Sequence, residues 1–346
     1  MSAVLAALIA LSCCTEPALA ASHRMLARRP LVYMTFVRRP DHGNAAVTCT
    51  WHVVWCRFRR GARVYTAAVP PAERRYRYAP HWAYETTRPG EYRAMINGAV
   101  YNQAVVPSLP IGGVGQGSKG WTLGCEATNP KFCFGMTADG RKTKSGLPPF
   151  ALREMVVAYA RRGTNVDNEG RMVSFYTVAP EIRHNYPYGF GCVGALVKPG
   201  GWPVWNALRG GWQNGESLGP SARLARTAVA WTRDGDLFFV TCTNPKAGAD
   251  PSKTGATWSE TVDFVVNYLP AGMKHDYPYM IKRRVHKKID GAVMLDGGGS
   301  TMLGYKHITH AGNVDIDHDA PHGPHGYRDV LPLIPDFIYA IGRNRE

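Results

Sequence analysis

The sequence predicts an α+β protein built from mixed, mainly antiparallel sheets with a few helices. Short segments rich in β-branched and aromatic residues, each bounded by Gly, Pro or Asn, outnumber the segments with helical periodicity. The two kinds of segment do not alternate regularly, as they would in a doubly wound parallel sheet. The expected strands are residues 31–38, 51–58, 64–69, 94–96, 172–178, 193–197, 226–231 and 237–242.

Turn and capping signals define some of the connections. The Asp234-Gly235 pair between the last two expected strands predicts a hairpin turn. Thr257 and Glu260 have the spacing of a capping box, and apolar residues then recur at helical intervals, at positions 262, 265, 266 and 269. This pattern predicts a helix with one apolar face. A second helix is expected over residues 149–161.

The amino-terminal segment differs from the rest of the chain. Residues 3–11 form an uncharged apolar run, and Ala18-Leu19-Ala20 has the small-x-small pattern that signal peptidase recognises. We therefore expect a signal peptide over residues 1–20 and a secreted or periplasmic protein; a lipoprotein signal using Cys13 or Cys14 is the alternative. No other stretch is apolar over the length of a membrane helix, so no transmembrane segment is expected.

The cysteines that follow this segment are even in number, which suits an oxidising compartment and a framework of disulfide bonds. Several connectivities are possible, and spacing favours one of them. It pairs Cys49 with Cys56, Cys125 with Cys133 and Cys192 with Cys242. The close pairs lack C-x-x-C spacing, which disfavours a zinc site or thioredoxin-like chemistry.

Composition and charge limit the classes of function. The chain has 346 residues, of which 45% are hydrophobic and 19% charged, as in a folded globular protein. It carries 41 Lys and Arg against 26 Asp and Glu, for a formal net charge of +15, which favours an anionic substrate or partner. The arginines are scattered and no recognition motif is present, so specific nucleic-acid binding is disfavoured. For an exported basic protein, phosphate-bearing glycans and cell-surface polymers are at least as natural as partners.

One stretch carries the strongest chemical signal. Residues 292–295 form a short apolar run that predicts a buried strand, and Asp296 follows it directly. Glycines then permit backbone angles that let successive N–H groups converge on an anion. The pattern favours a carboxylate beside a phosphate-sized hollow; the alternative is a tight turn in which Asp296 caps a helix. The residues after Asp296 are Gly297, Gly298, Gly299, Ser300 and Thr301.

A series of segments follows one another in a characteristic order. They read Ala-Met-Ile-Asn-Gly-Ala-Val-Tyr-Asn at 94–102, Phe-Gly-Met-Thr-Ala-Asp-Gly at 134–140, Gly-Cys-Val-Gly-Ala-Leu-Val at 191–197, Arg-Thr-Ala-Val-Ala-Trp-Thr-Arg-Asp-Gly at 226–235, Gly-Ala-Thr-Trp-Ser-Glu at 255–260 and Leu-Asp-Gly-Gly-Gly-Ser-Thr at 295–301. In this order they resemble the phosphodiester glycosidase family. The resemblance implies a phosphodiester glycosidase-like domain over residues 91–346, preceded by a β-rich extension of unknown role over residues 21–90.

The chain also departs from the family pattern. Ala99 stands where a glycine is usual, and a long basic piece, residues 273–288, is inserted before the Asp296 strand. Its Lys282–Lys288 part reads as a solvated basic face that could also dock an anionic polymer.

The resemblance implies a hydrolase that cleaves sugar-1-phosphodiester linkages in a glycan or cell-surface polymer. Such a reaction needs a phosphate clamp and a carboxylate near the anomeric carbon. We expect Arg226 to bind the phosphate with its planar fork, Asp296 to act as general base or electrostatic stabiliser, and Asn97 to orient the sugar or phosphate. Further expected phosphate-binding residues are Gly98, Thr227, Gly297, Gly298, Gly299, Ser300 and Thr301. The alternatives are a non-catalytic module that binds phosphorylated or acidic glycans and a metal-dependent phosphodiesterase.

No cofactor is required on these grounds. Residues 315–326 nevertheless combine acids and histidines, and could bind a divalent cation through Asp317, His318, Asp319 and His322. The spacing matches no standard zinc or EF-hand pattern, so a solvated loop beside the site is the competing interpretation.

Overall fold

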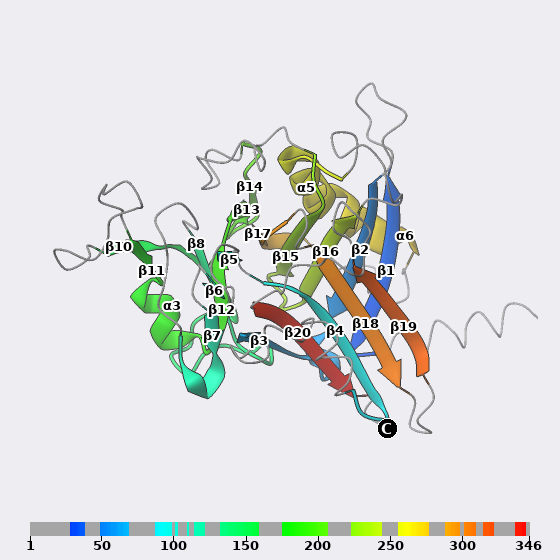
Figure 1. Ribbon diagram of the computed structural model, residues 1–346, viewed down its shortest axis with the longest axis horizontal. Coiled ribbons are helices and arrows are strands. Elements are labelled where there is room, and N and C mark those ends of the chain that lie inside the picture. The colour runs from blue at the N-terminus through cyan, green and yellow to red at the C-terminus, as the bar shows by residue number, and fades with distance from the viewer. Residues whose placement is uncertain are drawn as a thin grey trace, which may run out of the picture.

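The computed structural model describes residues 28–38, 49–68, 87–98, 101–102, 109–110, 114–121, 132–158, 175–206, 223–243, 255–276, 288–297, 301–308, 314–321 and 336–343. Within these ranges the chain is mostly strand, and all the strand pairs recorded there are antiparallel. The predicted α+β class with mainly antiparallel sheets is confirmed (Figure 1).

The central layer is a seven-stranded sheet. Its order is β1 (Leu31–Arg38), β2 (Cys49–Cys56), β16 (Leu237–Thr243), β15 (Arg226–Thr232), β17 (Ile289–Met294), β13 (Gly194–Lys198) and β14 (Trp202–Pro203). From β2 to β13 both faces of this sheet are buried, and alternate side chains of a strand enter different apolar clusters. In β15, Val229 and Trp231 enter one cluster, whereas Ala228 and Ala230 enter the other.

A continuous helical segment covers one face of this sheet (Figure 1). It consists of α5 (Trp258–Asp263), the π-helical turn η5 (Phe264–Tyr268) and α6 (Leu269–Asp276). The predicted capping box is present, since Thr257 Oγ1 accepts from Glu260 N at 3.2 Å and Glu260 Oε2 accepts from Thr257 N at 2.9 Å. Phe264 stacks on Trp51 of the sheet, with ring centroids 4.1 Å apart.

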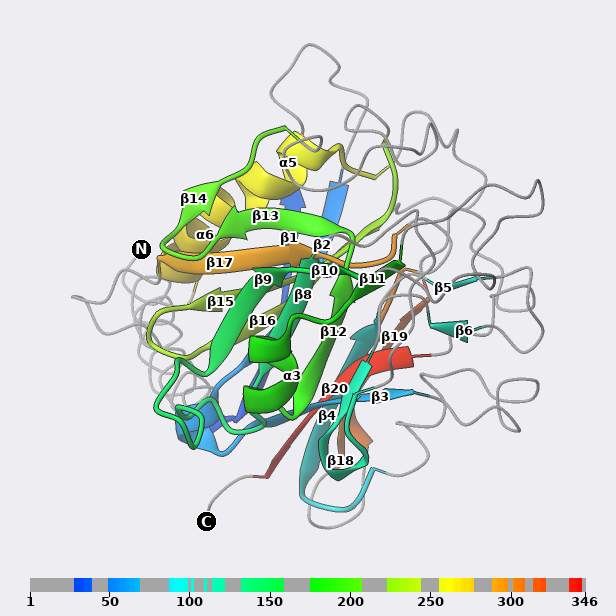
Figure 2. The same cartoon turned by 90° about the vertical axis from the view of Figure 1, so that its left-hand side faces the viewer.

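Two smaller sheets pack against the other face (Figure 2). One has the order β19 (Val314–Pro321), β18 (Met302–Ile308), β4 (Glu91–Asn97), β20 (Asp336–Arg343) and β3 (Arg63–Ala68). The other has the order β7 (Val114–Gln116), β12 (Tyr188–Cys192), β8 (Phe132–Met136) and β9 (Phe150–Glu154). Phe134 contacts Trp231 of the central sheet at a centroid distance of 4.9 Å, so all three sheets share one core.

The remaining elements are short. They are the strand pairs β5 (Tyr101–Asn102) with β6 (Leu109–Pro110) and β10 (Val156–Ala158) with β11 (Phe175–Thr177), the helix α3 (Pro180–Asn185), and the 3-10 turns η1 (Phe58–Arg60) and η2 (Gly117–Lys119).

Two sequence-based expectations about elements differ from the structure. The helix expected over residues 149–161 is wrong, because Phe150–Glu154 pairs with β8 and Val156–Ala158 pairs with β11. Pairing with a neighbouring strand overrode the local helical pattern. Within residues 21–90, expected as a β-rich extension, the described strands β1, β2 and β3 belong to the main sheets. β2 pairs with β16 and β3 pairs with β20, so residue 90 marks no boundary between sheets.

The expected disulfides are absent among the described cysteines. Cys56, Cys133, Cys192 and Cys242 are buried free thiols, and Cys125 lies outside the described residues. Cys49 and Cys56 begin and end one extended strand, which separates them by about 23 Å at 3.3 Å per residue. Cys133 and Cys192 occupy neighbouring strands but enter different clusters. Burial raises the pKa of Cys133 to about 11 and that of Cys192 well above its ordinary value, so both behave as apolar core residues.

No helix in the described ranges is long and apolar enough to cross a membrane. The expected signal peptide over residues 1–20 lies outside those ranges.

Candidate active site

Four strand ends bring the predicted site residues to one edge of the facing sheets. Asn97 ends β4, Thr227 lies near the start of β15, Asp296 follows β17 and Met302 begins β18. The central residue of this group is Asn97, which is fully buried.

The Asn97 side chain connects the other three segments. Its Nδ2 donates to the Asp296 carbonyl at 2.8 Å, and its Oδ1 accepts from Thr227 Oγ1 at 2.8 Å and from Met302 N at 3.1 Å. Both ends of the amide are therefore engaged by the protein. This geometry gives Asn97 a positioning role, because it fixes the turn that carries Asp296.

Asp296 lies at the start of a tightly packed turn. It is 9% exposed, its N–H donates to the Gly98 carbonyl at 3.3 Å, and its Oδ1 accepts from Gly297 N at 3.0 Å. Gly297 and Gly98 both lie so close to other parts of the chain that a side chain would not fit. A β-carbon at Gly297 would lie 2.9 Å from the Ala225 carbonyl oxygen, and one at Gly98 would overlap Asp336 Oδ1. The turn is thus held directly against the start of β15.

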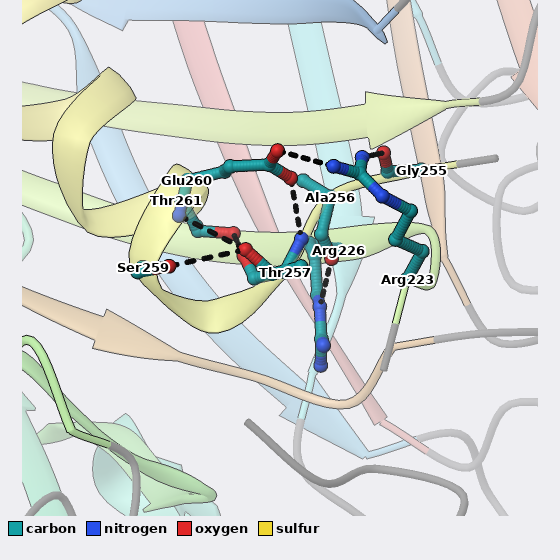
Figure 3. Close-up of polar contacts among 8 residues, drawn as sticks. All are labelled: Arg223, Arg226, Gly255, Ala256, Thr257, Ser259, Glu260 and Thr261. Carbon is teal, nitrogen blue, oxygen red and sulfur yellow. Dashed lines mark hydrogen bonds and ion pairs between the residues drawn. The ribbon is translucent and has the colours of Figure 1, made fainter. Parts of the chain in front are cut away.

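Arg226 begins β15 and is 3% exposed. Its Nε donates to the Ala256 carbonyl at 2.9 Å, and Figure 3 shows its terminal nitrogens directed away from the neighbouring Arg223–Glu260 ion pair. Burial lowers the Arg226 pKa to about 10, an effect that the negative fields of Cys242 and Glu260 only partly offset. The protein thus keeps a cation in a medium of low dielectric constant, where attraction to an anion is strong.

The threonines of the site fall into two groups. Thr227 donates its hydroxyl to Asn97, so it supports the turn. The Thr301 and Thr241 hydroxyls are buried and have no hydrogen-bond partner among the described residues. Thr301 precedes Met302, and Thr241 pairs with Thr227 across β15 and β16. Buried hydroxyls that have no partner among the described residues can bind water or ligand oxygens.

The other predicted site residues are placed as follows. Gly298, Gly299 and Ser300 lie outside the described residues, as does the metal candidate His322. Asp317, His318 and Asp319 lie in β19, where a solvated loop had been the competing expectation. No group of three or more His, Cys, Asp or Glu suited to a metal occurs in the part of the chain that the structure describes.

Sequence reasoning missed a polar row inside the central sheet. His52 of β2 pairs with Thr241 of β16, which pairs in turn with Thr227 of β15. The Tyr33 hydroxyl lies 2.6 Å from His52 Nδ1. The signal was present, since His52 interrupts the apolar run of β2, but only the sheet order shows that it lies in line with Thr227.

Comparison with known proteins agrees with this fold. The sequence model of the phosphodiester glycosidase family matches residues 134–331, more than half of the chain. No curated protein sequence gives a significant match. The catalytic domain of zebrafish N-acetylglucosamine-1-phosphodiester alpha-N-acetylglucosaminidase, in a form auto-inhibited by its pro-peptide, has a similar structure. Its TM-score is 0.50 and its identity 14%, over 92% of this chain and 84% of that one.

A hypothetical protein from Synechocystis gives a TM-score of 0.47 at 15% identity, over 91% of this chain and 62% of that chain. The family match covers β8 to β19, including the strands that carry Arg226 and Asp296. The chain therefore belongs to the phosphodiester glycosidase family.

Proposed function

We propose that the protein is an exported hydrolase that cleaves sugar-1-phosphodiester linkages in a glycan or cell-surface polymer. One observation carries this proposal: a buried cation and a buried carboxylate lie on contacting segments. A β-carbon at Gly297, next to Asp296, would lie 3.9 Å from Arg226 Cα. The substrate of such a site carries negative charge on its phosphate and develops positive charge at its anomeric carbon.

In the proposed reaction Arg226 binds two oxygens of the phosphodiester and stabilises the departing phosphate monoester. The bond between the anomeric carbon and the phosphate oxygen breaks, and its electron pair leaves with the phosphate. A water oxygen bonds to the anomeric carbon, and Asp296 accepts the water proton. Phosphate is a good leaving group, so the mechanism needs no strong general acid. Asn97 keeps Asp296 in place through the Asp296 carbonyl.

Hydrogen-bond donors complete the proposed phosphate site. The buried Thr301 hydroxyl, which has no partner among the described residues, is such a donor, whereas the Gly297 N–H already donates to Asp296 Oδ1 and helps to orient that carboxylate. Gly298, Gly299 and Ser300 are assigned by their sequence pattern alone. The proposal requires no cofactor, and a divalent cation near Asp317–Asp319 is an outcome that the experiment below would detect.

Export is proposed from the sequence of residues 1–20. The free core cysteines supply no support for an oxidising compartment, so this part depends on the leader pattern. Mass spectrometry of the protein recovered outside the cytoplasm should show an amino terminus close to Ala21.

The deciding experiment treats purified mature protein with a panel of sugar-1-phosphate diesters in water labelled with oxygen-18. A phosphodiester glycosidase places the label in the sugar. Label in the phosphate, with activity lost to a chelator, would instead identify a metal-dependent phosphodiesterase. Binding without release of either product would identify a non-catalytic module.

A further inference from the structure

The hairpin between β13 and β14 presents an exposed tryptophan. Pro199, Gly200 and Gly201 form its turn, in which the glycines have φ of 91° and 79°. Only glycine adopts such angles without strain. Trp202 follows the turn and is 72% exposed, and Trp205 is 51% exposed. Exposed tryptophans at one sheet edge suggest a contact surface, because burial of an indole ring is strongly favoured.

This hairpin is held by several hydrogen bonds. Gly201 N donates to the Lys198 carbonyl at 3.1 Å and to the Asp290 carbonyl at 2.9 Å. A β-carbon at Gly200 would lie 3.3 Å from Trp202 Nε1, so the indole rests against the turn. The ring is therefore pre-organised, which reduces the entropy lost when a ligand binds.

Cationic side chains flank Trp202. Lys198 is its direct partner in the antiparallel β13–β14 register, and directly opposed residues place their side chains on the same face. The Lys288 side chain lies against the turn, since a β-carbon at Gly201 would be 3.0 Å from its Cε and 3.5 Å from its Nζ. Both lysines are exposed. The surface thus combines an aromatic face with positive charge.

Hydrogen bonds join this hairpin to the helix that starts beside Arg226. Val204 N donates to the Leu196 carbonyl at 2.9 Å, and the Val204 carbonyl accepts from Trp258 Nε1 at 2.7 Å. Trp258 begins α5, two residues after Ala256, which accepts from Arg226. Figure 2 shows β14 at the open edge of the central sheet beside α5. The hairpin turn lies at the start of β17, where Gly201 N donates to the Asp290 carbonyl, and Asp296 follows the other end of that strand, about 20 Å away at 3.3 Å per residue. A ligand that occupies both places must therefore be a chain several sugar units long.

We propose that Lys198, Trp202 and Lys288, with Trp205 on the side toward α5, form a surface that binds an acidic glycan chain. The apolar C–H faces of sugar rings pack on the indole, and the lysines pair with carboxylate, sulfate or phosphate groups. This inference rests on the proposed function and deepens it. It specifies a substrate whose chain is acidic and extends beyond the cleaved linkage.

The test measures binding by calorimetry and is independent of turnover. Its probes are acidic tetrasaccharides that carry carboxylate, sulfate or phosphate groups, with neutral maltotetraose for comparison. We expect saturable binding of at least one acidic probe and weaker binding of maltotetraose. Trp202→Ala should weaken that binding about tenfold or more, and Trp202→Phe should restore part of it. Lys198→Ala and Lys288→Ala should also weaken it, whereas Lys144→Ala, which removes an exposed cation elsewhere, should not.

Different outcomes overturn different parts. Failure of every acidic probe to bind, or equal binding by Trp202→Ala, removes the proposed surface. If the lysine variants bind the acidic probes more weakly but Trp202→Ala does not, the attraction is only electrostatic, and the proposed surface is also overturned. Stronger, Trp202-dependent binding to anionic lipid vesicles would assign the surface to a membrane instead. A failure of the proposed catalysis is distinguishable, because Asp296→Asn should leave this binding unchanged.

Discussion

Two arginines at the amino end of α5 occupy opposite environments (Figure 3). Arg223 pairs with the carboxylate of Glu260 and also donates to the Gly255 carbonyl at 3.3 Å. The same carboxylate completes the capping box with Thr257. Arg226 is more deeply buried, and its Nε donates to a neutral carbonyl, that of Ala256.

The two cations differ in burial: Arg226 is 3% exposed, whereas the Arg223 side chain is 20% exposed. Arg223 is matched by an opposite charge that also holds the helix start, so it stabilises the fold. Burial lowers the Arg226 pKa to about 10, which corresponds to a folding cost on the order of 3 kcal/mol for keeping the charge. An anionic ligand would offset that cost. We therefore expect Arg226 to matter for activity and Arg223 for stability.

The largest expected effect is the loss of turnover when the carboxylate of Asp296 is removed. Asp296→Asn keeps the side-chain volume but removes the charge, so turnover of a sugar-1-phosphodiester should be abolished while the melting temperature changes little. Activity within about tenfold of wild type, roughly 1.4 kcal/mol in barrier, would exclude a catalytic role for Asp296. Unfolding of the variant would show that Asp296 serves the turn alone.

Replacing each arginine by methionine tests the comparison directly. Arg226→Met should lower kcat/KM about a thousandfold, as loss of a buried charged contact to a transition state does, without lowering stability. Arg223→Met should destabilise the protein by about 1–3 kcal/mol and leave kcat/KM within a few-fold.

A second pair of variants tests the geometry of the clamp. Arg226→Lys keeps the charge but loses the planar fork, and should also impair kcat/KM. Arg233→Lys in the β15–β16 turn is the matched control. Equal kcat/KM for these two lysine variants would place the phosphate clamp elsewhere.

The lowered pKa gives a pH test. At pH below about 10 Arg226 is protonated in both the folded and unfolded states, so its folding cost is constant. Above that pH the folded state loses the proton first, the unfolded state binds more protons, and stability attributable to Arg226 rises with pH. The stability advantage of Arg226→Met over wild type should therefore narrow as pH rises through 10. Affinity for inorganic phosphate, measured by calorimetry, should fall over the same range. If the stability difference between Arg226→Met and wild type did not change with pH, this would contradict a lowered pKa of Arg226.

Removing the helix cap beside Arg223 should have a smaller effect, on stability alone. Thr257→Ala removes the acceptor for Glu260 N and should cost about 1 kcal/mol of unfolding free energy. Chemical denaturation measures this change, and kcat/KM should stay near wild type. A large loss of activity would show that the cap also shapes the Arg226 side.

The smallest expected effect concerns Cys242, which lies opposite Arg226 in the β15–β16 register and is buried without a disulfide bond. Reductant should leave the unfolding midpoint unchanged, and thiol counting of the unreduced, denatured protein should detect Cys56, Cys133, Cys192 and Cys242. Absence of these thiols would restore the disulfide framework and change the field around Arg226.

Local patterns in the sequence were sufficient for many elements. The capping box at Thr257 and Glu260, the turn at Asp234-Gly235 and the apolar strand before Asp296 are encoded within a few residues, so they could be predicted without tertiary contacts. The order of motifs likewise identified the family. The helix expected over residues 149–161 failed because its residues complete a sheet whose other strands are distant in sequence.

The sequence by itself determined the residue types of the candidate site: a carboxylate at 296, an arginine at 226, an amide at 97 and glycines around them. Only the tertiary structure decided what these residues contact and how deeply they are buried. Asn97 joins segments 130 to 205 residues away, as its bonds to Thr227 and Met302 show, and such contacts leave no local pattern. Burial likewise depends on packing from the whole chain. It makes Arg226 a deeply buried cation, whereas Arg223, three residues earlier, stays partly exposed at the helix start. It also places Cys56, Cys133, Cys192 and Cys242 in the core, although the even number of cysteines had favoured disulfides.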